Sequence, residues 1–144
     1  MNALSRRERE AFDELFEGIL GELPGELHEL IEEAPVIIED QPDEAILREL
    51  QMPAESAGEL CGLHTGVPLT ERSVHSEFEL PTTIHLFRRG IIDHAGGWEP
   101  WEDEDGRRWG GPDAVAEEIR ITLLHEIGHH FGLDEDDLAR LGYD

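Results

Sequence analysis

The chain has 144 residues, 38% of them hydrophobic, which is enough for one sizeable core and too little for two ordinary domains. Residues 1–144 are therefore expected to form a single domain. The 35 acidic residues against 11 basic ones give a formal charge of -24, and such a surface repels phosphate backbones and anionic membranes. Neither a nucleic acid nor a membrane is expected as a partner.

The distribution of apolar residues and the cysteine content indicate a cytoplasmic location. No segment approaches the roughly 20 apolar residues of a membrane span, and the charged N-terminal segment has no apolar signal-peptide core. Cys61 is the only cysteine, which excludes an intramolecular disulfide and fits a reducing compartment.

The N-terminal third predicts two helices, a strand and a further helical turn. Apolar residues with helical spacing predict an amphipathic helix over residues 5–22 that ends near Pro24, and a short second helix around Leu27–Ile31. The β-branched run Val36–Ile38 predicts a buried strand, and residues 45–50 predict another helical turn.

The middle of the chain is rich in breakers. Residues 53–82 hold many glycines and prolines, which predicts loops around one short strand near residues 60–63. Residues 83–87 alternate in polarity and predict a strand. His85 within that strand has two interpretations, an approach to a functional cleft or ordinary packing, and packing is the more common role of a lone strand histidine.

Residues 93–112 are rich in glycine and acid and contain all three tryptophans, Trp98, Trp101 and Trp109. This composition predicts a mobile flap. The tryptophans either anchor substrate under a lid or pack a surface insertion onto the domain, and packing is the favoured alternative.

Asp113 is a suitable N-cap for a helix over residues 114–131 that carries the motif His125-Glu126-Ile127-Gly128-His129. Histidines four residues apart lie about 40° apart around a helix, so one metal ion can bridge them. A catalytic zinc takes three protein ligands. Gly132 is suited to end the helix in the left-handed conformation, after which Glu135 could supply the third ligand, with Asp134 as its nearest competitor.

Glu126 projects about 100° round the helix from His125 and is expected to act as general base on the attacking water rather than as a ligand. Glu118 and Thr122 lie on the ligand face as candidate supports. His130 falls on the apolar face and is expected to be a core residue. Residues 136–141 predict a short helix, and Tyr143 beyond it is a frayed terminus or an oxyanion donor.

Three segments resemble the small bacterial zincin-like metallopeptidases: HEIGHHFGLDEDDLARLG, GLHTGVPLTERS and PTTIHLFRRG. The first is close to that family's C-terminal signature, whereas His64 stands where an aromatic tyrosine is expected. The resemblance implies an α+β zincin-like fold with a small mixed sheet and a central active-site helix. It also implies that the strand over residues 83–87 is an edge strand beside that helix that can pair with extended substrate.

These features together predict a zinc metallopeptidase that binds one Zn2+ per chain through His125, His129 and Glu135 and hydrolyses a peptide or protein substrate, with Glu126 as catalytic base. The alternative is a non-catalytic zincin scaffold that binds a metal or a peptide. A purely structural zinc is less favoured, because such sites usually hold four ligands rich in cysteine. The native metal, the substrate and the oligomeric state stay open.

Overall fold

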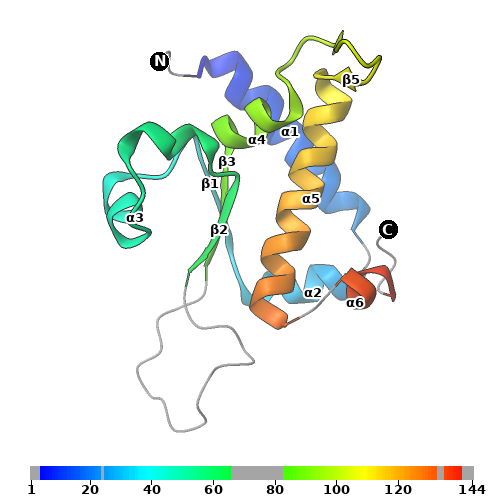
Figure 1. The fold of residues 1–144 in the computed structure, drawn as a ribbon. Coiled ribbons are helices and arrows are strands. Elements are labelled where there is room, and N and C mark those ends of the chain that lie inside the picture. The colour runs from blue at the N-terminus through cyan, green and yellow to red at the C-terminus, as the bar shows by residue number, and fades with distance from the viewer. Residues whose placement is uncertain (1–3, 24, 66–82, 133–134, 141–144) are drawn as a thin grey trace, which may run out of the picture.

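The computed structural model describes residues 4–23, 25–65, 83–132 and 135–140, which form helices around two small sheets (Figure 1). The elements in chain order are α1 (Arg6–Glu22), α2 (Gly25–Glu33), β1 (Val36–Glu39), α3 (Glu44–Glu49), the 3-10 helix η1 (Ala54–Glu59), β2 (Gly62–Thr65), β3 (Thr83–Phe87), α4 (Arg88–Ala95), β4 (Trp101–Glu102), β5 (Arg108–Trp109), α5 (Pro112–Phe131) and α6 (Glu135–Arg140).

The first helix forms where the amphipathic pattern predicted it. Ser5 caps its N-terminus, since the Ser5 hydroxyl accepts the N–H of Glu8 and the Glu8 carboxylate accepts the N–H of Ser5. The apolar stripe of α1 is buried, with Phe12 fully enclosed. The predicted α2, β1, α3, β2, β3 and α6 are also confirmed to within a few residues.

The main sheet is small and mixed, as predicted, with strand order β1-β3-β2. β3 pairs parallel with β1 and antiparallel with β2, so β3 lies in the middle and β2 is the outer strand nearer α5. The prediction that residues 83–87 form the edge strand beside the helix is therefore wrong: β2 occupies that place. Local sequence could not reveal this, because strand order depends on pairing between distant segments.

One hydrophobic core lies between this sheet and the helices α1, α4 and α5. Its fully buried members come from five elements and from the connection between α2 and β1, and are Phe12, Leu27, Ala34, Ile84, Leu86, Ile91, Val115, Ile119, Leu123 and Ile127. Burying a side chain of this kind contributes about 1.5–3 kcal/mol, so the core fixes how α5 sits against the sheet.

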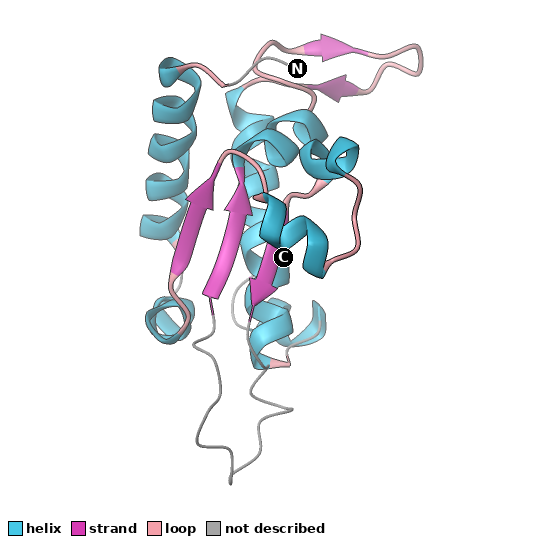
Figure 2. Ribbon diagram, turned by 90° about the vertical axis from the view of Figure 1, so that its left-hand side faces the viewer, coloured by secondary structure: helices cyan, strands magenta, loops and turns pink. Residues whose placement is uncertain are grey.

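The opposite face of the sheet is partly open (Figure 2). Ile37 on β1 is 44% exposed and the other residues of the strand are partly buried, which corrects the prediction of a buried strand. His85 lies on this outer face, because Leu86, its neighbour, faces the core. Its Nδ1 is 2.9 Å from Glu39 Oε1 and its ring stacks on Phe87 at 6.1 Å. His85 is therefore a packing residue on the side of the sheet away from α5.

Helix α4 was not predicted and follows β3 without a linker. Its first residue, Arg88, bonds through its guanidinium to Asp13 of α1 at 3.0 Å and to Asp40 at 2.9 Å. Burial raises the pKa of Asp40, but hydrogen bonds from Arg9 and Arg88 outweigh that effect and leave this pKa lowered. The ion pairs hold α4, α1 and the end of β1 together.

The glycine-rich and tryptophan-rich segment contains regular secondary structure, and whether it moves as a flap stays a prediction. Residues 93–95 end α4, and β4 and β5 form an antiparallel hairpin in which Trp101 faces Trp109. The hairpin leads directly into the N-terminus of α5, so it stands at one end of that helix (Figure 1).

In the described part of the chain, no helix is long and apolar enough to cross a bilayer.

Candidate metal-binding site on helix α5

Helix α5 carries the whole HExxH motif within its last two turns. The helix begins two residues earlier than predicted: Gly111 is its N-cap and Pro112 its first residue, so Asp113 lies in the first turn and is not the cap. Proline is favoured at the first helical position because a backbone N–H there would have no acceptor within the helix, so proline loses no hydrogen bond. The C-terminal end of α5 is as predicted, since Gly132 has the left-handed conformation, with φ 67°, and its N–H bonds to the Gly128 carbonyl.

The described residues of the motif differ in exposure. His125 is exposed on the surface of α5, whereas Glu126 is partly buried and Ile127 is fully buried in the core. His129 is in α5 one turn after His125, and Glu135 is the first residue of α6, three residues after Gly132. The side chains of His129 and Glu135 lie outside the described residues, as do Asp134 and Tyr143 and the side chain of His130.

Strand β2 passes very close to α5 at the motif. A Cβ atom on Gly62 would lie 2.7 Å from Thr122 Cγ2 and 3.2 Å from Glu126 Cγ, so only glycine leaves room for these two side chains. Thr122 and Glu126 therefore belong to the contact of α5 with β2. Sequence reasoning did not identify Gly62, and no local signal marks it.

The packing against β2 changes the acidity of Glu126. Burial raises the pKa of this carboxyl, and the neighbouring His125, when protonated, lowers it in part. Glu126 and His125 thus differ in exposure, because their side chains point to different sides of one helix. This difference is the one expected if Glu126 is a general base and His125 is a metal ligand.

The two candidate supporting residues both have contacts with other elements. Thr122 is buried against Gly62, and Glu118 Oε2 lies 3.8 Å from His94 Nε2 of α4. Cys61 is near the same acid: burial first, and then the charges of Glu118 and Asp93, raise the pKa of its thiol to about 11. Without a metal ion or another cation beside it, this thiol stays protonated and unreactive near neutral pH.

The part of the chain that the structure describes contains no group of three or more His, Cys, Asp or Glu side chains able to hold a metal ion. The side chains of His129 and Glu135 lie outside the described residues, so the predicted ligand set stays a prediction. The residue types that the two helices carry at these positions are ones that zinc accepts as ligands. They are two histidines one helical turn apart on α5 and a glutamate at the start of α6.

The sequence model of the zincin-like metallopeptidase family matches residues 31–143, which is most of the chain. The chain belongs to the zincin-like metallopeptidase family. No functionally curated protein matches it in sequence. The matched segment of this zincin-like protein begins within α2 and includes the sheet, the hairpin, α5 and the start and body of α6. Family membership thus agrees with the resemblance read from the three sequence segments and with the mixed α+β fold.

Proposed function

We propose that this zincin-like protein is a zinc-dependent peptidase that binds one zinc ion per chain through His125, His129 and Glu135. The observation that carries the proposal is the packing of α5 against β2, which keeps Glu126 half-buried beside Gly62 while His125 stays exposed on the same helix. Family membership supports it at the level of the reaction class.

The chain's own residues divide the chemistry between them. Zinc, when bound, acidifies water and polarises a carbonyl group. A carboxylate oxygen of Glu126 accepts the proton of the attacking water and then donates it to the leaving amine, so the same group serves as base and as acid. His125 and His129, neutral and one turn apart, are suited to hold the metal, and Glu135 supplies a negatively charged third ligand.

We also propose a peptide or protein substrate bound in extended form along β2, the strand of the main sheet that lies against α5. Backbone N–H and C=O groups of an outer strand can pair with a peptide irrespective of its side chains. The proposed location is the cytoplasm, on the basis of the single cysteine; cell fractionation tests it.

The test begins with metal content, measured by mass spectrometry on protein purified without added metal. We expect about one zinc per chain in the wild type and its loss in His129→Ala and in Glu135→Ala. His94→Ala is the matched control, because His94 is an exposed histidine of α4 and is not a proposed ligand. A peptide-library digest with the zinc-loaded protein then tests hydrolysis.

Each outcome separates the alternatives. Zinc without hydrolysis of any library peptide would favour a non-catalytic zincin scaffold. Protein that contains no metal and takes up none on titration would contradict the metal site. Retention of zinc in Glu135→Ala, with its loss in His129→Ala, would transfer the third ligand to another residue, with Asp134 the first to substitute.

A further inference from the structure

The β4–β5 hairpin presents two tryptophan rings to solvent at the end of α5 opposite the motif. Trp101 is 48% exposed and Trp109 37% exposed, and their rings stack with centroids 6.0 Å apart and planes 21° apart. His125 is thirteen residues beyond Pro112, so it lies roughly 20 Å along α5 from this pair at 1.5 Å per residue. The pair is therefore separate from the candidate metal site.

Both indole N–H groups are already used within the protein. Trp101 Nε1 donates to the Gly96 carbonyl oxygen at 2.9 Å, and Trp109 Nε1 donates to Asp103 Oδ2 at 2.9 Å. What the rings offer to a ligand is consequently their π surface. Groups that bind such a surface are apolar groups and cations, since the face of an aromatic ring carries negative potential.

The charge around the rings favours a cation over an apolar group as the ligand. Residues 99–113 contain six acidic side chains and two arginines. Asp103 is held ionised, because hydrogen bonds from the Trp109 indole and from the backbone N–H groups of Arg107 and Asp105 lower its pKa. A carboxylate that accepts the indole N–H makes the ring more electron-rich and thereby strengthens its attraction for a cation.

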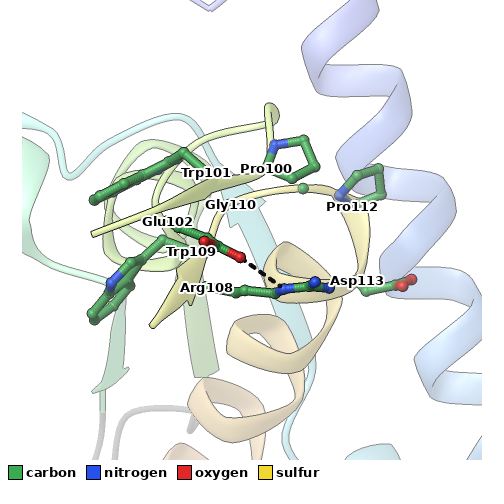
Figure 3. Close-up of a pocket in the computed structure, with 9 residues that line it drawn as sticks. Pro100, Trp101, Glu102, Arg108, Trp109, Gly110, Pro112 and Asp113 are labelled. Atoms are coloured by element: carbon green, nitrogen blue, oxygen red, sulfur yellow. Dashed lines mark ion pairs between the residues drawn. The ribbon is translucent and has the colours of Figure 1, made fainter. Parts of the chain in front are cut away.

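A hollow of about 480 Å³ adjoins the pair (Figure 3). Its lining residues include both tryptophans, Pro100, Pro112 and the ion pair of Glu102 with Arg108, whose atoms are 3.4 Å apart. Glu102 and Arg108 pair with each other on the opposite face of the hairpin from the two indole rings, because successive side chains of a strand alternate, so this arginine does not compete for the rings. A hollow lined by aromatic and proline rings suits an extended peptide.

The backbone holds this surface in place before any ligand arrives. Gly110 N–H bonds to the Ala95 carbonyl at 2.8 Å, and Gly111 N–H bonds to the Gly97 carbonyl at 3.0 Å, which ties the hairpin to the end of α4. Rigid aromatic residues lose little conformational entropy on binding, which is why they serve as anchors at interfaces.

We propose that the stacked pair Trp101 and Trp109 is a binding site for the cationic side chain, arginine or lysine, of an extended peptide segment. Occupancy of this site does not depend on hydrolysis, so the experiment below gives its answer whether or not the protein is a peptidase.

The probe is a short peptide of arginine, proline and glycine, compared with the same peptide in which glutamine replaces arginine. Binding is measured by calorimetry in about 0.15 M salt, where the Debye length of about 8 Å limits attraction by the overall negative charge. We expect the arginine peptide to bind and to shift the indole proton signals of Trp101 and Trp109 in NMR spectra. Trp101→Leu and Trp109→Leu should each weaken binding by about two- to five-fold, the range for an exposed cation–π contact.

Ile37→Ala is the matched control, since Ile37 is another exposed apolar residue, on the outer face of the main sheet. It should leave the affinity unchanged. Equal binding of the glutamine peptide, or unchanged affinity in both tryptophan variants, would overturn the proposal. So would sedimentation showing that a second copy of the chain covers the pair. The peptide comparison in the wild type keeps the test decisive even where a tryptophan variant disturbs the hairpin.

Discussion

Helix α5 meets the rest of the protein in two contrasting ways. Near its C-terminal end, strand β2 approaches so closely that Gly62 has no room for a side chain, and Glu126 is half-buried in the contact. At its N-terminal end, the hairpin leaves the Trp101 and Trp109 rings largely uncovered. The first end encloses part of a carboxyl group, whereas the second offers a fixed surface to solvent. One long helix thus joins a region suited to chemistry and a region suited to recognition.

Glu126→Gln is expected to have the largest effect on the rate of hydrolysis, compared with a matched change at the hairpin end. Removal of a general base costs about 10²- to 10⁴-fold in rate, while zinc content should stay at the wild-type level because Glu126 is not a proposed ligand. Glu99→Gln makes the same chemical change near the hairpin and should leave kcat unchanged. Steady-state kinetics and metal analysis on both variants make the comparison. Full activity of Glu126→Gln would exclude the proposed mechanism.

Gly62→Ala tests whether the close approach of β2 positions Glu126. The added methyl meets Thr122 Cγ2 and Glu126 Cγ, and overpacking of this kind costs about 1–3 kcal/mol in the free energy of unfolding. A displacement of Glu126 by about 1 Å could lower kcat by about 100-fold. Denaturant unfolding and kinetics measure the two effects separately.

The matched rescue variant is Gly62→Ala combined with Thr122→Ser. Serine lacks the methyl group that lies nearest to the added Cβ, so part of the lost stability should return. If Gly62→Ala is as stable and as active as the wild type, β2 does not constrain Glu126 in the way the geometry indicates.

At the hairpin end, Gly110→Ala and Gly106→Ala separate collision from backbone strain. Both glycines have positive φ, 74° and 81°, so alanine at either position costs about 1 kcal/mol or more. A Cβ on Gly110 would also collide with the Glu99 carbonyl oxygen, whereas a Cβ on Gly106 meets nothing within 4 Å. Thermal unfolding should therefore show the larger loss for Gly110→Ala, with kcat per folded molecule unchanged in both. A fall in that kcat would link the hairpin to catalysis.

The comparison also indicates which features could be read from the sequence. Periodic helices such as α1 were predicted because their burial pattern repeats along the chain, and Gly132 was predicted because a helix end favours glycine. The motif identified α5 and the family. These signals are local, and local signals predicted the C-terminal end of α5 in most of its described detail.

The features that were missed depend on distant partners. Helix α4 begins with Arg88, whose bonds reach Asp13 and Asp40, and neither lies near it in the sequence. The contact of Gly62 with Glu126 joins residues 64 positions apart. The hairpin is different, because Asp105-Gly106 between two tryptophans is a turn signal that could have predicted its paired strands.

The smallest expected effect is the titration of Asp103, which should act on the hairpin alone. Its pKa in the folded state is lowered from the ordinary value of 3.8, above all by the hydrogen bond from Trp109 Nε1. The stabilising contribution is thus complete above pH 3.8 and is lost as the pH falls through the lower, folded-state pKa. The Trp109 indole proton signal should shift in that acidic range, and in Asp103→Asn it should not.

The Trp101 indole, which bonds to a backbone carbonyl, serves as internal control, and methyl signals of the core report whether the fold is intact. If both indoles shift together while the core is folded, acid changes the hairpin as a whole and Asp103 is not its titrating group.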